Sequence, residues 1–344
     1  MIAVAEVPRR RHRQPVLDSI PITGLAILRK CAEYADATAM GLWVRRGEGA
    51  RRDPLSFHGD FPGMPIGITR MLTGLNNQRM CLLGLFSIAR ERGTSAVLPE
   101  TAVDYAPRVV ARHRDILLGK LFDLPTLVSA IPPDLLSGEP PGELISFRDC
   151  FAARVRPLES ESRDSLAASV MLGTVATRRI ADRATELGEW LLARGAVPLQ
   201  LRIERDWQAY LRHKWGEDSQ PVRDADPDTI LARLRRTPSL ADVRTLWACC
   251  DDEDLLQTTG ELKEIARRHR FELLFKTDLP TEVRQPKRVI LRAMMDFTMC
   301  RNAPRYIGLQ GSTFSRMLAR ENAWLGRPRE VQYFDRDVDV AMPV

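Results

Sequence analysis

The chain has 344 residues, of which 44% are hydrophobic and 28% are charged. This is long enough for two globular domains, and the composition is not that of a disordered or fibrous protein. The net charge of +6 allows an anionic partner, but the only dense basic cluster is "PRRRHR" at residues 8–13. We interpret this cluster as a solvated arm, so a nucleic-acid binder is disfavoured.

The cysteines and the hydropathy pattern bear on the cellular compartment. None of the six cysteines belongs to a C-x-x-C pair, which predicts free thiols in a reducing compartment and disfavours a structural zinc site. No stretch approaches ~18 uninterrupted apolar residues, so we expect no transmembrane segment. The first residues lack the pattern of a signal peptide, and we therefore expect a cytoplasmic protein.

The first part of the chain predicts an extension followed by an α/β unit. The extension covers residues 1–62, with an amphipathic helix over 18–45 and a polar loop, and we assign it no chemistry. A first domain over 63–160 begins with the strand "PIGITRML", the turn "TGLNN", the helix "NQRMCLLGLFSIARER" and the short strand "TSAVLP". Its Pro- and Gly-rich segment 125–162 predicts a loop-rich crossover.

The second part repeats this alternation, which predicts a second domain over 161–330 and a tail over 331–344. The expected elements are a long helix over 163–195, strands over 199–206, 243–250, 271–276 and 305–311, and helices over 252–269, 286–300 and 312–325. We therefore predict an α/β protein with two Rossmann-like domains facing each other. Ligands of such sheets bind beyond the carboxyl ends of the strands.

Three segments carry candidate site residues. In "LQLRIERDW" (199–207), a strand would place Arg202, Glu204 and Asp206 on one face near its carboxyl end. A guanidinium can grip a diphosphate with two charge-assisted hydrogen bonds, although a surface ion cluster explains the same residues. In "GSTFS" (311–315), Ser312 or Thr313 begins a helix and either binds phosphate or only caps the helix.

The third segment is "GLNNQR" (74–79), a glycine turn that leads into a helix with two asparagines and Arg79. It is neither a G-x-G-x-x-G sequence nor a P-loop, which disfavours NAD and ATP folds, and it could be no more than a polar helix start. The acidic run "CDDED" (250–254) is expected to complement the N-terminus of the following helix rather than to hold a metal.

Taken together and in this order, the segments resemble the GDP-fucose protein O-fucosyltransferase-like superfamily. The similarity runs over residues 64–325 and includes "GLNNQRMCLLGLFSIARERGTSAVLP", "LFDL" (121–124), "LQLRIERDW" and "AMMDFTMCRNAPRYIGLQGSTFSRML". It implies a GT-B-type fold of two Rossmann-like domains. Gln200 stands where the signature H-L-R-I-x-x-D-W has histidine, which changes any nucleoside contact made there.

The resemblance also assigns roles to residues. Arg202 falls on the arginine that contacts the β-phosphate and glycosidic oxygen of the donor, and Asn77 falls on the asparagine at the reaction centre, with Asn76 as the alternative register. Glu204 and Asn77 are both candidates for deprotonating the acceptor. The further donor-binding residues that we expect are Arg79, Asp206, Asp296, Ser312, Thr313 and Phe314.

The predicted function is transfer of fucose from GDP-fucose to a hydroxyl group, with inversion and without a metal or other cofactor. The acceptor is open, and a glycan, a lipid or a protein fits equally well. Two alternatives remain: a transferase of the same fold that uses another nucleotide sugar, and a non-catalytic protein that binds a nucleotide sugar or a partner.

Overall fold

The computed structural model describes residues 63–104, 114–154, 158, 162–283, 285–309, 312–327 and 330–333. The predicted helix over 18–45, the rest of the extension up to residue 62, and residues 334–344 of the predicted tail lie outside the described residues. Within the described part of the chain, no helix is both long and apolar enough to span a membrane.

The second half is built on a five-stranded parallel sheet. Its strands are β5 (Ala196–Leu199), β6 (Thr245–Ala248), β7 (Glu272–Leu274), β8 (Arg305–Gly308) and β9 (Glu330–Tyr333). Their order in the sheet is β7-β6-β5-β8-β9, and every neighbouring pair is parallel. The order reverses direction on either side of β5, as in a doubly wound nucleotide-binding sheet, so a crevice opens beyond the carboxyl end of β5.

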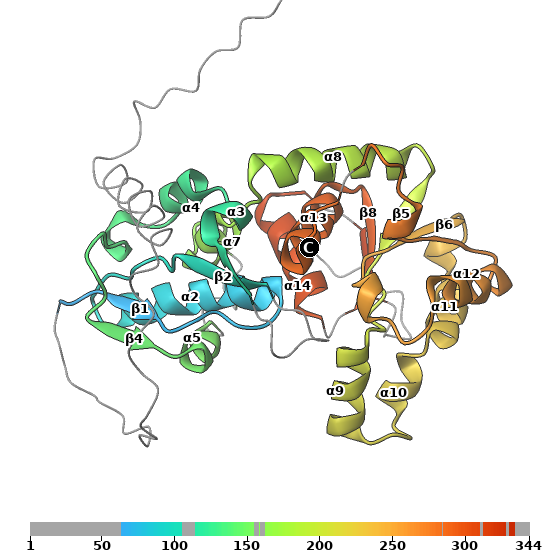
Figure 1. Cartoon of the computed structure of the whole chain (residues 1–344), viewed down its shortest axis with the longest axis horizontal. Helices are drawn as coiled ribbons and strands as arrows, with labels where there is room; N and C mark the ends of the chain where they lie inside the picture. The colour runs from blue at the N-terminus through green and yellow to red at the C-terminus, as the bar shows by residue number, and fades with distance from the viewer. Residues whose placement is uncertain are drawn as a thin grey trace, which may run out of the picture.

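Helices connect and cover these strands (Figure 1). They are α8 (Arg178–Leu192), α9 (Arg205–Trp215), α10 (Gln220–Asp224), α11 (Pro227–Arg236), α12 (Thr259–Arg268), α13 (Val289–Asn302) and α14 (Thr313–Trp324), with 3-10 turns η4 (Pro238–Leu240), η5 (Asp252–Asp254) and η6 (Lys276–Asp278). Before them, α7 (Leu166–Gly173) packs against α2 (Leu75–Glu91) and α4 (Leu124–Ala130) of the first half. Helices α9 and α10 extend together away from the sheet, at the bottom of the view in Figure 1.

The first half combines short strands with helices. Its elements are β1 (Ile66–Ile68), α2 (Leu75–Glu91), β2 (Thr101–Asp104), β3 (Arg114–Leu117), α3 (Leu118–Leu121), α4 (Leu124–Ala130), η3 (Pro133–Leu135), β4 (Glu143–Ile145) and α5 (Phe147–Ala153). Strands β1 and β4 are parallel, and Ala96 in the predicted strand "TSAVLP" forms single parallel bridges to Ile66 and Leu136. Strands β2 and β3 form an antiparallel pair.

Several predicted elements differ from the structure, three of them near the site or the junction of the two halves. The strand expected over 199–206 is β5, which ends at Leu199, because the chain turns where the Ile203 N–H donates to the Leu201 carbonyl at 3.1 Å. The single helix expected over 163–195 is two helices, because the chain leaves the helix at Thr174 and Ala176 forms an antiparallel bridge to Phe122. The crossover expected over 125–162 contains α5, β4 and most of α4.

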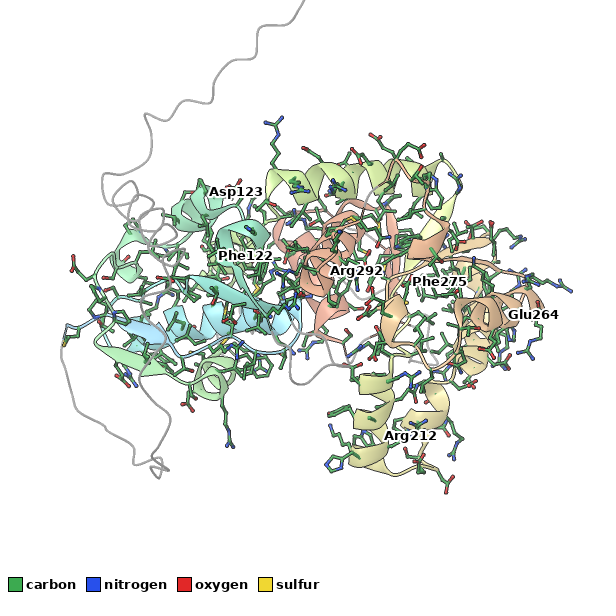
Figure 2. The ribbon with its side chains drawn as sticks, viewed as in Figure 1. Phe122, Asp123, Arg212, Glu264, Phe275 and Arg292 are labelled. Carbon is green, nitrogen blue, oxygen red and sulfur yellow. The ribbon has the colours of Figure 1, made fainter. Side chains whose placement is uncertain are left out.

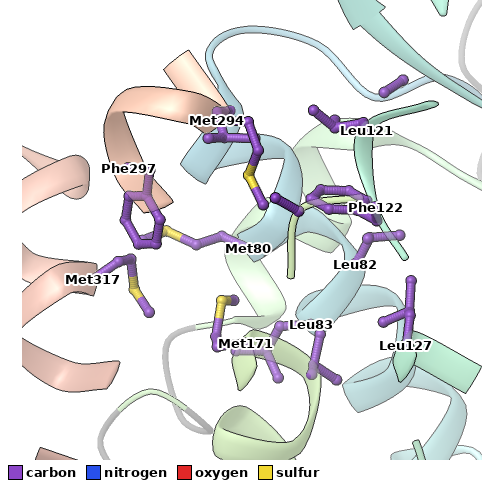
Figure 3. Close-up of a cluster of buried hydrophobic side chains, with 14 of the residues drawn as sticks. Met80, Leu82, Leu83, Leu121, Phe122, Leu127, Met171, Met294, Phe297 and Met317 are labelled. Atoms are coloured by element: carbon purple, nitrogen blue, oxygen red, sulfur yellow. The ribbon is translucent and has the colours of Figure 1, made fainter. Parts of the chain in front are cut away.

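The main hydrophobic core joins the two halves. Figure 3 shows Met80 of α2, Met171 of α7, Met294 of α13 and Met317 of α14 among its side chains. Unbranched methionine side chains fill irregular gaps, as is needed where several helices cross. A second core packs the opposite side of the five-stranded sheet against α11 and α12. The predicted domain boundary near residue 160 stays a prediction.

Candidate functional site

A cavity of about 470 Å³ lies beyond the carboxyl ends of β5, β6 and β7, between the N-termini of α2 and α14. It brings together nine of the predicted site residues: Asn76, Asn77, Arg202, Glu204, Asp206, Asp296, Ser312, Thr313 and Phe314. They come from both halves of the chain, which is how ligand crevices are formed in open α/β folds. The sequence therefore predicted the location of the cavity well.

Arg202 is held in place by two carboxylates. Its Nη1 and Nη2 atoms donate to the two oxygens of Asp206 at 3.2 and 3.1 Å, and Nη1 lies 3.0 Å from Glu204 Oε2. The guanidinium carbon also lies 5.4 Å from the centre of the Trp207 ring. Burial opposes the charged form, but the two carboxylates outweigh it and raise the pKa of Arg202. The side chain stays 26% exposed, so a ligand in the cavity can reach it.

The carboxylate partners have different environments. Asp206 lies in the first turn of α9, where it accepts the Trp207 N–H at 2.7 Å. Glu204 is buried and accepts the Asp251 N–H at 3.3 Å. Burial raises the pKa of Glu204 above its ordinary value, although the nearby Arg202 favours the ionised form. The strand alternation expected for these residues is wrong, but the turn after β5 still gathers them around Arg202.

The N-terminus of α14 forms the opposite wall. The Ser312 side chain caps the helix by accepting the Phe314 N–H at 3.2 Å, and it also accepts a hydrogen bond from Gln200 Nε2 at 2.7 Å. The amide oxygen of Gln200 accepts hydrogen bonds from the hydroxyls of Ser315 and Tyr306. Gln200 thus ties the end of β5 to the start of α14.

This contact requires glycine at position 308. A Cβ atom there would lie 2.3 Å from Ser315 Oγ, too close for any side chain without moving the serine. The absence of a side chain at Gly308 therefore lets the N-terminal turn of α14 approach β8 and hold Ser312 at the edge of the cavity.

The N-terminus of α2 also faces the cavity. Gly74 is its N-cap residue and offers no side chain, so the positive end of the helix dipole is not covered by a capping group. Asn76 accepts a hydrogen bond from Arg79 Nη1 at 2.9 Å, and this leaves its amide N–H groups for other acceptors. The buried Oδ1 atom of Asn77 has no hydrogen-bond partner. Both asparagines are placed to contact a ligand.

Arg79 is placed differently from the prediction. Its side chain is fully buried outside the lining of the cavity, where it forms an ion pair with Glu321 of α14. It also donates to Thr174 Oγ1 at 2.8 Å and to the Met171 carbonyl at 2.6 Å. The turn at residues 74–77 faces the cavity, but Arg79 lies one helical turn further along α2, in the protein interior. We therefore assign Arg79 to the contact between α2 and α14 and not to donor binding.

Two cationic residues of the cavity were not predicted. Lys276 follows β7 and is buried, with its Nζ 3.1 Å from Asp296 Oδ2 and 3.5 Å from Asp252 Oδ1. Burial disfavours its charge, but these carboxylates outweigh burial and raise its pKa. Arg292 of α13, labelled in Figure 2, lies 3.2 Å from Asp251. The position of Lys276 at the end of a predicted strand was an available signal, whereas nothing in the sequence distinguished Arg292.

The acidic run at 250–254 differs from the expectation. Helix α12 begins later and is capped by Thr258, while Asp251 caps the short η5 turn and pairs with Arg292. Asp252 pairs with Lys276. The run therefore neutralises cationic side chains of the cavity. Among the residues that the structure describes, no group of three or more His, Cys, Asp or Glu side chains is placed to hold a metal ion.

Comparison with solved structures places the chain in the class of GT-B-type α/β folds. A crystal structure of POFUT1 in complex with GDP matches with a TM-score of 0.51 and 13% identity, over 80% of this chain and 99% of that chain. POFUT1 in complex with GDP-fucose gives a TM-score of 0.50 and 14% identity, over 80% and 98%. No family model and no curated protein matches the chain. The predicted resemblance to the fucosyltransferase-like superfamily is confirmed at the level of the fold.

Proposed function

We propose that the protein is a glycosyltransferase that transfers fucose from GDP-fucose to a hydroxyl acceptor, with inversion and without a metal. The observation that carries this proposal is the position of Arg202, which is clamped by Glu204 and Asp206 and exposed to a cavity between two helix N-termini. The likeness to POFUT1, whose structures hold GDP and GDP-fucose, supports it. The cytoplasm remains the proposed location.

The diphosphate would lie between Arg202 and the N-terminus of α14. The described hydrogen bonds of Arg202, both to Asp206, use two of the five N–H groups that a guanidinium carries, so others remain for phosphate oxygens. The backbone of Thr313 and Phe314 lies in the first turn of α14, where the helix dipole favours an anion. The N-terminus of α2 adds a second favourable dipole across the cavity.

Asp296 supplies a site for the nucleobase. One oxygen of its buried carboxylate pairs with Lys276, and the other, Oδ1, has no hydrogen-bond partner. A buried acceptor without a donor is costly, and a ligand that brings an N–H group to this oxygen recovers that cost. Guanine carries adjacent N–H groups that suit a carboxylate. Phe314 packs edge-on against Phe297 beside this position.

Transfer then follows from charge and geometry. The acceptor oxygen attacks C1 of fucose on the face opposite to the diphosphate, the bond from C1 to the β-phosphate oxygen breaks, and GDP leaves with the electron pair. Arg202 stabilises the charge that grows on the β-phosphate. Glu204, which lines the same cavity, is the candidate to receive the acceptor proton, and Asn77 orients the reacting groups.

One observation favours a nucleotide sugar other than GDP-fucose as the donor. The amide of Gln200 is engaged by Ser312, Ser315 and Tyr306, so it holds the α14 turn rather than a nucleoside. The histidine expected at this position would offer a different contact. A transferase of the same fold that uses another nucleotide sugar is therefore the second candidate.

Calorimetric titration with GDP-fucose, GDP-mannose and UDP-glucose, in the presence of EDTA, tests both candidates. We expect GDP-fucose to bind with micromolar affinity or better, about 8 kcal/mol. Arg202→Ala should abolish this binding while the protein stays folded by circular dichroism, whereas Arg178→Ala, on an exposed arginine of α8, should leave binding unchanged. Preferred binding of another donor supports the second candidate, and no binding of any donor by the folded protein contradicts both.

A further inference from the structure

A continuous series of aromatic and cationic side chains runs from the cavity along α9. The rings of Trp207 and Tyr210 are stacked, with centres 5.3 Å apart and planes inclined by 25°. Lys214 Nζ lies 5.5 Å from the centre of the Tyr210 ring and 4.9 Å from that of Trp215. At the other end, Trp207 lies against Arg202. We call Trp207, Tyr210, Lys214 and Trp215 the α9 aromatic surface.

This surface begins at the proposed reaction centre and ends in solvent. Trp207 and Tyr210 line the cavity, and Tyr210 and Trp215 are 46% and 55% exposed. From residue 207 to residue 215 the helix rises by ~12 Å, which is long enough for more than one sugar ring. Helix α9 extends away from the sheet (Figure 1), and along it the rings change from half-buried at Trp207 to exposed at Tyr210 and Trp215. Leu211 and Gln208 face the protein interior instead and hold the helix in place.

The chemistry of this surface suits a saccharide. The exposed large hydrophobic side chains of α9 are Tyr210 and Trp215, aromatic rings with polar edges, and its aliphatic Leu211 is buried. A sugar ring presents C–H groups on its faces and hydroxyl groups at its rim, so it can stack on an aromatic ring while it hydrogen-bonds to neighbouring polar groups. A lipid tail would need aliphatic side chains, whereas the exposed large hydrophobic side chains of α9 are aromatic.

We propose that the acceptor is an oligosaccharide that stacks on the α9 aromatic surface and so presents a hydroxyl group next to Arg202. This rests on the proposed function, because it identifies the acceptor of that transfer. Rigid aromatic rings in series can hold a flexible glycan in one orientation at low entropic cost. The hydroxyl that reacts is then the one that reaches the cavity past Trp207.

Saturation-transfer NMR on the full chain tests the proposal without turnover. The probes are chitotetraose, maltotetraose and lactose, with a pool of Ser- and Thr-containing peptides as the competing class. We expect saturation of the C–H protons of at least one saccharide, and an increase of at least tenfold in its dissociation constant in Trp215→Ala. Trp215→Phe, which keeps a ring, should lose less than threefold. Leu192→Ala, on another exposed apolar side chain, is the control.

Several outcomes would overturn the proposal: no saccharide signal, signal from the peptides alone, or a dissociation constant for Trp215→Ala within twofold of wild type. Circular dichroism melting confirms that each variant folds. Calorimetry with GDP-fucose separates the two proposals, because donor binding without saccharide binding contradicts only the acceptor. Saccharide binding without binding of any donor contradicts the proposed function and leaves the α9 aromatic surface as a glycan-binding surface.

Discussion

Replacing Glu321 with glutamine tests the buried link between α2 and α14. Glu321 is fully buried and pairs with Arg79, and its second oxygen lies 3.3 Å from Arg301. Burial lowers the pKa of Arg79, although Glu321 partly offsets this effect. Glu321→Gln keeps the shape of the side chain but leaves both cations without their carboxylate. Because a charge left buried without a partner costs ~3–5 kcal/mol, we expect unfolding free energy to fall by about this amount.

Urea unfolding followed by circular dichroism measures this loss. Glu143→Gln is the matched control, because it removes an exposed ion pair with Arg92 that should contribute less than ~1 kcal/mol. A double variant, Arg79→Met with Glu321→Met, should be less destabilised than the sum of its single variants, because neither charge is left alone. The reasoning is refuted if Glu321→Gln stays within about 1 kcal/mol of wild type, or if Arg79→Lys weakens donor binding while stability is unchanged.

Three further predictions concern packing, pH and the cavity. Gly84→Ala should lower the free energy of unfolding by ~3 kcal/mol or more, because the added Cβ would lie 1.6 Å from a backbone oxygen of α5. Gly188→Ala in α8 should raise it by up to ~1 kcal/mol, because the nearest atom to the added Cβ is 3.9 Å away and alanine favours a helix. Urea unfolding measures both. Burial raises the pKa of Glu204 from 4.5, so just above that pH the folded chain keeps a proton that the unfolded chain has released. The free energy of unfolding should therefore fall as pH rises above 4.5, and it should fall less steeply in Glu204→Gln. Parallel pH profiles of the two proteins would contradict this. Lys276→Met removes the cation that favours the ionised form of Asp296 and should weaken GDP-fucose binding at least tenfold by calorimetry. Unchanged affinity would show that this pair does not serve the donor.

The sequence placed the site well where local chemistry and chain position agree. Arg202 follows an apolar strand and Ser312 begins a helix after a strand, so both positions fall at the carboxyl edge of the sheet whichever residue ends the strand. Position was a weaker signal for Arg79. The turn before α2 faces the cavity, but Arg79 lies one turn further along the helix, where α7 and α14 cover it.

Pairings between distant segments could not be predicted in the same way. Glu321 meets Arg79 across 242 positions, and Lys276 meets Asp296 between η6 and α13. A single sequence shows no periodicity that connects such partners. The position of the exposed α9 rings could not be predicted either. Their spacing suggests a helix, but only the fold shows that this helix begins at the rim of the cavity and extends away from it.

The amino-acid sequence by itself predicted the α/β alternation, the carboxyl-edge position of the cavity and nine of the residues that line it, because hydrophobic periodicity and helix or strand ends are local properties. The tertiary structure alone decided which charges neutralise one another, which polar atoms remain open to a ligand and which side chains are buried. Those properties depend on the dielectric and geometric surroundings that appear only when segments far apart in the chain pack together.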